Sequence, residues 1–345
     1  MTHPALSPRE QARRLWQQCF ADSDAFVDLY FSRRYSDAIH RAVYEDGQLV
    51  SALQAVPYPV RFWGVEVKAA YVSGACTAPA HRNRGHMSHL LRSSLLRMYD
   101  EGTDLSLLIP AEPWLFGYYA RFGYATAFDR SRRTVHMSAL DTAGATSTRT
   151  YEPHPDEAWA YLLHRSRQRS CCVLHTRDDW DIVLADLALS NGRLIGAARG
   201  GRMVGLGCAV PEADRLYFPL LEADDADARN CLLYEAGRLG LSEATYVTDT
   251  SDEAATAPLG MARILHAERL LEHYAAAHPH QSACIRLSDP LLPANNACFR
   301  WHEGRLSRTS QPQADARPCS ISELAPLLLG YRGHEGYPMM SLMLD

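Results

Sequence analysis

The chain has 345 residues, of which 47% are hydrophobic and 22% are charged, as in ordinary globular proteins with sizeable cores. The net charge of -5 argues against a nucleic-acid partner, and no uncharged apolar run is long enough for a membrane span, so we expect no membrane partner either. The nine cysteines and 15 histidines show neither a disulfide framework nor a zinc-type spacing, and the first residues of the sequence do not form an apolar segment of the kind that directs export. We therefore expect reduced thiols, no metal and a cytoplasmic location.

The first elements combine helical spacing with a strand meander. Apolar residues at helical intervals predict helix over residues 8–31. Three strands are expected next, with Gly47 and Gly64 in the turns: residues 39–44, 49–56 and 60–67.

Residues 71–87 lead from an apolar strand through Pro79 into an arginine-rich turn that opens an amphipathic helix. The backbone N–H groups of a helix's first turn have no partner within the helix and attract anions, so a phosphate group is a candidate ligand. Gly85 permits close approach of the backbone, and Arg82 and Arg84 add positive charge. Such turns also occur without a ligand, and this segment alone supports both interpretations equally.

After this helix, residues 105–109 resemble a short buried strand. A helix-length connection places it parallel to the preceding strand, in a right-handed βαβ unit. A short helix that ends on Gly123 is expected next, and it contains the aromatic run Tyr118, Tyr119 and Phe122.

Two motifs in this region resemble those of acyl-CoA-dependent N-acyltransferases of the GNAT superfamily. The run from Arg82 to Met87 (RNRGHM) is similar to the superfamily signature Arg/Gln-x-x-Gly-x-Gly/Ala. The run from Tyr119 to Tyr124 (YARFGY) is similar to the Tyr-x-Arg-Phe-Gly-Tyr element of its enhanced-intracellular-survival-like branch, which the chain resembles over nearly its whole length. Met87 replaces a small residue of the signature, so its side chain must point into the sheet.

The resemblance implies an α/β (α+β) protein with three parts. Residues 1–140 are expected to form a GNAT domain with a mixed, splayed sheet, residues 141–260 a second GNAT-like domain without a cofactor site, and residues 261–345 a sterol-carrier-like domain. The sequence pattern adds a linker at 141–150 and further elements. These are helices at 156–169 and 226–239, a hairpin of 193–198 with 203–210, a helical face from Met261 to Tyr274, strands at 284–287 and 298–301, and a helix at 321–329.

The resemblance also implies acetyl-CoA as co-substrate, a small amine as acceptor and a direct attack of the amine on the thioester. Tyr119 matches the general acid, with Tyr118 as its nearest rival. The terminal carboxylate of Asp345 matches the base, acting through a water; a frayed tail is the alternative. The cofactor-binding residues would be Ala75, Cys76 and Thr77 through their main chain, with Arg82, Asn83, Arg84, Gly85, His86, Met87, Ser88, Ala111 and Glu112.

Plainer interpretations of several of these residues stay open. Glu112 is equally well explained as an acid at a helix N-terminus, His81 and His86 as solvated loop residues, and Cys76 as a small strand residue. Two further functions compete with catalysis: acyl-CoA sensing without turnover, and transport of an apolar ligand by the C-terminal part. A homo-oligomer is compatible with the resemblance.

Overall fold

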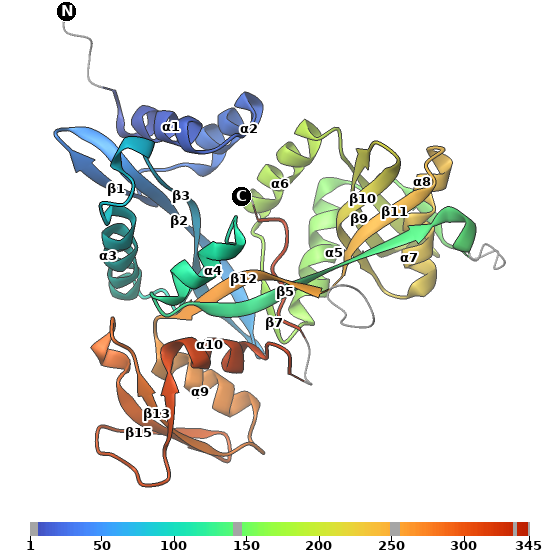
Figure 1. Cartoon of the computed structure of the whole chain (residues 1–345). Helices are drawn as coiled ribbons and strands as arrows, with labels where there is room; N and C mark the ends of the chain where they lie inside the picture. The colour runs from blue at the N-terminus through green and yellow to red at the C-terminus, as the bar shows by residue number, and fades with distance from the viewer. Residues whose placement is uncertain (1–5, 141–146, 249–255, 334–336, 344–345) are drawn as a thin grey trace, which may run out of the picture. The chain divides into compact units, whose positions relative to one another are not determined.

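The computed structural model describes residues 6–140, 147–248, 256–333 and 337–343 of the chain (Figure 1). The chain divides into two compact units. The first unit comprises Met1–Phe128 and Leu259–Pro338, and the second comprises Asp129–Pro258 and Met339–Leu344. Helices and strands alternate in both, which confirms the expected mixed α/β class.

The first unit begins with helices, as the spacing predicts for residues 8–31. They are α1 (Pro8–Cys19), α2 (Asp24–Leu29) and a π-helical turn (Tyr30–Arg34). A capping box between Ser7 and Glu10 starts α1. The buried faces of these helices, with Trp16 and Tyr30, pack against the sheet at Leu49, Ala52 and Cys76.

The main sheet of the first unit has the order β1-β2-β3-β4-β12. Its strands are β1 (His40–Glu45), β2 (Gln48–Phe62), β3 (Val65–Thr77), β4 (Leu105–Leu108) and β12 (Thr256–Ile264). The strand predicted at 49–56 lies within β2, which runs unbroken from Gln48 to Phe62. The separate strand predicted at 60–67 was placed wrongly, because residues 60–62 belong to β2 and the turn at Gly64 leads into β3. Pro57 and Pro59 are tolerated because they lie beyond Gln54, the last residue paired with β1, so their missing N–H groups break no hydrogen bond to that strand.

The predicted βαβ unit is present. Helix α3 (His86–Asp100) connects β3 to β4, which are parallel over Ala69–Tyr71 and Leu105–Leu107. The apolar face of α3 joins a core that also holds Leu53, Tyr119 and Met261. A short helix, α4 (Pro113–Ala120), follows β4 and ends three residues before Gly123.

The helical face predicted from Met261 to Tyr274 was wrong in its first half. Residues 261–264 are strand and pair antiparallel with β4, and helix α9 begins only at Ala267 and ends at Ala277. All five residues from Met261 to Leu265 are buried. A short run that is apolar at most positions does not distinguish a buried strand from a helix, and pairing with β4 decides between them here.

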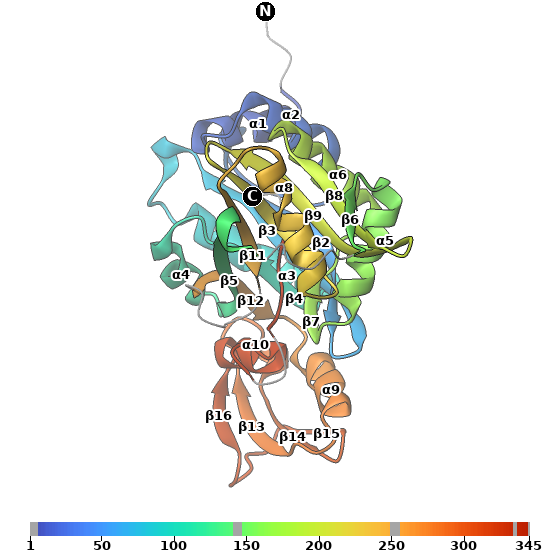
Figure 2. The ribbon, with the colours of Figure 1, turned by 90° about the vertical axis from the view of Figure 1, so that its right-hand side faces the viewer.

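The C-terminal part of the first unit is a four-stranded sheet with the order β15-β14-β13-β16. Its strands are β13 (Ala283–Ser288), β14 (Ala297–His302), β15 (Arg305–Thr309) and β16 (Arg317–Ser320). Helices α9 and α10 (Ile321–Leu329) pack beside this sheet (Figure 2). The strands predicted at 284–287 and 298–301 and the helix at 321–329 are confirmed, whereas β15 and β16 were not expected.

The second unit is a sheet with the order β5-β11-β10-β9-β8-β6 and its helices. Its elements are β5 (Ala125–His136), β6 (Arg149–Tyr151), α5 (Pro155–Arg167), β7 (Cys171–Val173), α6 (Arg177–Leu189), β8 (Arg193–Arg199), β9 (Arg202–Glu212), β10 (Arg215–Ala223), α7 (Ala226–Leu233), α8 (Glu235–Arg238) and β11 (Glu243–Thr248). The predicted β8–β9 hairpin is confirmed.

Two expectations for the second unit need correction. The helix predicted over 226–239 is interrupted at Tyr234 between α7 and α8. Of the predicted linker, residues 141–146 lie outside the described residues, whereas residues 149–151 form strand β6 and pair with β8. Across the described parts of the chain, no helix is both long and apolar enough to cross a bilayer.

An ion pair with no solvent exposure holds the parts of the first unit together. Arg263 on β12 donates to Asp289, at 2.8 Å, and both side chains are 0% exposed. Arg263 also donates to the carbonyl oxygen of Phe122, at 2.7 Å, directly after α4. A Cβ on Gly123 would lie 3.2 Å from the Arg263 guanidinium and 2.9 Å from Ile321, so this position, with φ +85, requires glycine.

Replacing Asp289 with alanine should destabilise the protein strongly, because it leaves the Arg263 guanidinium buried without its counter-charge. We expect a loss of about 3–5 kcal/mol in the free energy of unfolding, measured by urea denaturation. The matched control is Asp315→Ala, which breaks an Arg300–Asp315 pair whose side chains are 45% and 60% exposed. The control should change the free energy of unfolding far less, because solvent screens an exposed pair. Equal losses in the two variants would contradict a structural role for the buried pair.

Candidate cofactor site

The candidate site is the turn of residues 82–88 at the start of α3 (the α3 turn). Asn83 and Gly85 have positive φ angles of 63° and 85°, and Gly85 is the N-cap residue of the helix without a side chain to cap it. The first bond of the helix runs from His89 N–H to Gly85 C=O, at 2.9 Å. Among the described residues no partner is recorded for the N–H groups of residues 86–88, which therefore remain available to an anion.

Several other helices of the chain close their N-termini with a side chain, although α4, α8 and α9 do not. α1, α6 and α10 carry capping boxes from Ser7, Thr176 and Ser320. The first turn of α3 has no acidic residue, and a Cβ built on Gly85 would meet no atom within 4 Å. The positive end of the α3 dipole is therefore open to a ligand.

The two arginines of the α3 turn have different surroundings. Arg82 donates from Nε to the carbonyl oxygen of Thr77, at 3.2 Å, and so ties the turn to the end of β3. The Arg84 side chain is 56% exposed, with Nη1 3.7 Å from a carboxylate oxygen of Glu45. The exposed Arg84 guanidinium is placed to contact a phosphate at the rim of the turn.

Met87 takes the orientation that the sequence analysis required. Its side chain is half-buried and packs against the core between α3 and the sheet. The side chain therefore leaves the helix end open although it is larger than the usual residue.

Strand β3 extends beyond its pairing with β4 toward the α3 turn. Their pairing ends at Tyr71 and Leu107, whereas β3 continues to Thr77 along β2, with a bulge between Ser73 and Cys76. An extended ligand with amide groups could add to the free side of β3 as a strand would. The carbonyl oxygen of Cys76 already accepts from Ser51 Oγ, at 3.0 Å, so an added ligand would use the remaining main-chain groups.

Tyr119 lies on α4, and its side chain is only 8% exposed. Burial raises the pKa of its phenol well above the usual value, and the neighbouring Tyr124 and Tyr118 raise this pKa further. The hydroxyl therefore stays protonated at neutral pH, as a proton donor must. Its ring contacts Tyr118 and Tyr124, with centroids 5.4 and 5.9 Å away.

Tyr118 is the residue of α4 that contacts the α3 turn directly. Its hydroxyl lies 3.3 Å from the Ser88 hydroxyl in the first turn of α3, and the Arg121 guanidinium lies 4.6 Å from its ring centre. Both tyrosines thus remain candidates for contact with a bound thioester. Ala111 and Glu112 precede α4 and are exposed, and the Glu112 side chain makes no capping bond.

The cysteines near the site differ in reactivity. Hydrogen bonding with Cys19 and burial raise the pKa of the Cys76 thiol well above its usual range, which keeps this residue protonated and favours the plain interpretation of it as a small strand residue. The sequence analysis did not single out Cys19. Interactions with Cys76 and Arg82 lower the pKa of its thiol to about 7. Both partners are far from Cys19 in sequence, so no spacing could have indicated this.

The proposed base, Asp345, lies outside the described residues. The preceding tail belongs to the second unit, where the N–H of Val173 donates to Met339 C=O, at 2.9 Å. His175 Nε2 lies 2.9 Å from the carbonyl oxygen of Ser341.

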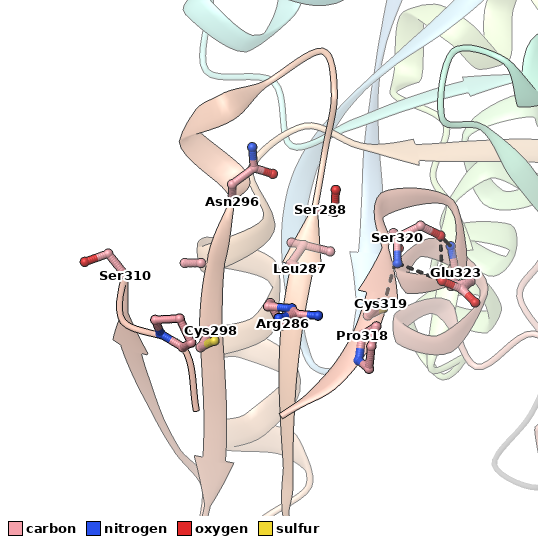
Figure 3. A pocket seen from close by; sticks show the side chains of 12 residues that line it. Arg286, Leu287, Ser288, Asn296, Cys298, Ser310, Pro318, Cys319, Ser320 and Glu323 are labelled. Atoms are coloured by element: carbon pink, nitrogen blue, oxygen red, sulfur yellow. Dashed lines mark hydrogen bonds between the residues drawn. The ribbon is translucent and has the colours of Figure 1, made fainter. Parts of the chain in front are cut away.

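A second hollow lies on the small sheet and has a different character. It has a volume of about 680 Å³, and Figure 3 shows Arg286, Ser288 and Ser320 among its lining residues. Glu323 accepts from the Ser320 backbone N–H and hydroxyl, at 2.7 and 2.6 Å, so the N-terminus of α10 is already capped. The lining mixes charged and hydroxyl groups with apolar side chains such as Leu287 and Ala297, so this hollow is not a predominantly apolar cavity.

Comparison with known families identifies the part of the chain that carries the α3 turn. Residues 5–127 match the family model described as an acetyltransferase (GNAT) domain. This range contains β3, α3, β4 and α4. The match supports a transferase enzyme. GNAT acetyltransferases use acetyl-CoA as co-substrate and transfer acyl groups to amines.

Solved structures share the fold over most of the chain. A probable N-acyltransferase from Enterococcus faecalis V583 has a TM-score of 0.77 at 18% sequence identity. The alignment covers 94% of this chain and 88% of that one. A GCN5-related N-acetyltransferase from Anabaena variabilis has a TM-score of 0.76 at 16% sequence identity. The alignment covers 92% of this chain and 86% of that one. Eis1 from Mycobacterium abscessus has a TM-score of 0.74 at 15% sequence identity. The alignment covers 93% of this chain and 87% of that one. A comparison with curated proteins finds no match.

Proposed function

We propose that the protein is an acetyl-CoA-dependent N-acetyltransferase that acts on a small amine. The observation that carries this proposal is the uncapped N-terminus of α3 inside a segment that matches an acetyltransferase domain. Free N–H groups, a helix dipole and Arg84 together suit the diphosphate of coenzyme A. The separated edge of β3, at Ala75, Cys76 and Thr77, suits its pantetheine amides.

The reaction needs a neutral amine, an oriented thioester and a proton for the departing thiolate. We propose Tyr119 as the proton donor, because α4 follows β4 directly and burial keeps the phenol protonated. An ordinary thiol has a pKa of about 8.5, so a phenol with a raised pKa can protonate the thiolate only when the bound thioester places the two atoms in contact. Proton transfer from Tyr119 thus depends on the position of its hydroxyl beside the sulfur as well as on its acidity.

We propose the terminal carboxylate of Asp345 as the proton acceptor. A carboxylate with a pKa of about 3.5 is too weak a base to deprotonate an ammonium directly with much driving force, so a water between the two would relay the proton.

We keep the expected domain layout as part of this proposal: a catalytic domain over 1–140, a second GNAT-like domain over 141–260 and a sterol-carrier-like domain over 261–345. The enzyme would work in the cytoplasm, where its nine free cysteines stay reduced, and would be able to form homo-oligomers.

Two other functions receive less support. A sensor would bind acetyl-CoA at the same turn without turnover, and only an activity assay separates it from an enzyme. A carrier of apolar ligands would need an apolar cavity in the C-terminal part, and the hollow found there is lined by Arg286 and several hydroxyl groups.

Acetyl-CoA at saturating concentration should raise the melting temperature, because a ligand that binds only the native state stabilises it. Gly85→Glu should abolish this shift by placing a negative charge at the helix end. The control is Gly102→Glu: Gly102 also has a positive φ, of 75°, and open space around it, but lies beyond the opposite end of α3. No shift with the wild type would exclude both the enzyme and the sensor, and an unchanged shift in Gly85→Glu would exclude the α3 turn as the site.

Thiol release with a panel of small amines should separate the two tyrosines. Tyr119→Phe should lower kcat about 100-fold or more, as expected for loss of a general acid, with little effect on acetyl-CoA binding. Tyr118→Phe should have a much smaller effect on kcat, since its hydroxyl makes a single contact, to Ser88. A larger loss in Tyr118→Phe would contradict the assignment of Tyr119.

Deletion of Asp345 should reduce kcat/KM for the amine about tenfold or more and leave the acetyl-CoA melting shift intact. Asp345→Asn is the control, because it removes the side-chain carboxylate but keeps the terminal one, and it should stay active. A fully active deletion variant would remove the terminal carboxylate from the mechanism.

A further inference from the structure

Three metal-binding side chains meet beside the α3 turn. Glu45 is the last residue of β1, His81 ends the 3-10 turn Pro79–His81, and His86 is the first residue of α3. His81 Nδ1 lies 2.8 Å from one carboxylate oxygen of Glu45, and His86 Nε2 lies 3.2 Å from the other. The tertiary fold thus brings one carboxylate and two imidazoles together from residues up to 41 positions apart in the numbering.

The spacing of the donor atoms is compatible with a single ion. One ligand atom from each residue can be chosen so that all three lie within 4.8 Å of one another. In a tetrahedral zinc site with bonds of about 2.0–2.1 Å, neighbouring ligand atoms are about 3.4 Å apart. Small rotations of the side chains would close that difference, and Glu45 and His81 are 37% and 23% exposed, which leaves them room to rotate.

His86 provides a second, independent observation. Its side chain is 13% exposed, and its Nε2 atom is buried without a hydrogen-bond partner, although it faces the carboxylate. Native proteins usually avoid leaving a buried polar atom without a hydrogen bond. A metal ion between the imidazole and the carboxylate would supply the missing interaction.

We propose that Glu45, His81 and His86 bind one zinc-type divalent cation at the edge of the α3 turn. Two imidazoles and one carboxylate suit Zn²⁺ and other late first-row metals, whereas Mg²⁺ and Ca²⁺ prefer oxygen ligands. Three protein ligands leave a coordination position for water or for an oxygen of a ligand. The Arg84 guanidinium, 3.7 Å from Glu45, disfavours a cation, but this side chain is 56% exposed and can move away.

The site would also hold the α3 turn in shape. The ion would join both sides of that turn, through His81 and His86, to the end of β1. The N–H groups of residues 86–88 would then keep their direction without a ligand. This inference concerns metal binding and is independent of whether the chain transfers an acetyl group.

The test is a titration of the chelator-treated full-length protein with Co²⁺, followed by visible absorption, and displacement of Co²⁺ by Zn²⁺. Tetrahedral Co²⁺ absorbs visible light far more strongly than hydrated Co²⁺, so the spectrum reports coordination directly. We expect one equivalent to bind, with affinity reduced more than about 100-fold in His86→Ala and in Glu45→Gln. Loss of an outer-shell partner alone commonly costs 10–100-fold, and a direct ligand should cost more.

His89→Ala is the matched control, since His89 is an exposed histidine on the same helix and is not part of the cluster. This variant should bind Co²⁺ like the wild type. All variants keep the nine cysteines, so binding to thiols would persist in each of them. The proposal is overturned if the wild type binds no equivalent of Co²⁺ or Zn²⁺, or if binding survives unchanged in His86→Ala and Glu45→Gln.

Discussion

The first unit depends on one buried interaction, between Arg263 and Asp289. Two charges without solvent exposure are stable only because every polar group around them has a partner: Asp289 also accepts from the N–H groups of Leu291 and Leu292 and from Asn295. The same guanidinium binds the carbonyl oxygen of Phe122, directly after α4. The C-terminal part of the chain therefore supports the helix that carries Tyr119.

The α3 turn follows a different physical rule. It is shaped by two residues with positive φ, Asn83 and Gly85, and the N–H groups of residues 86–88 have no partner among the described residues. Such groups are costly unless water or a ligand binds them, which makes the turn suited to an anion. Two side-chain interactions connect the turn to neighbouring strands. Arg82 donates to the carbonyl oxygen of Thr77 at the end of β3, and Glu45 on β1 lies beside His81 and His86.

Local patterns predicted the βαβ unit, the β8–β9 hairpin and α10, because each has a clear period and its own turn residues. They failed at residues 261–264, where pairing with β4 imposes a strand, and at residues 57–62, which continue β2 instead of separating two strands. The plain view of His81 and His86 as solvated residues also proved incomplete. Their partner, Glu45, lies on another strand and shows no spacing that a motif could contain.

The sequence by itself determined the α/β class, the arginine- and glycine-containing turn at the head of α3 and the aromatic residues of α4, since these depend on neighbours within a few positions. Only the tertiary structure decided that β12 lies beside β4, that Arg263 pairs with Asp289, that Tyr118 reaches Ser88 and that Glu45 meets two histidines. Each of these contacts joins residues that are remote in the chain. Their energy arises from burial and pairing after folding, which a local pattern does not encode.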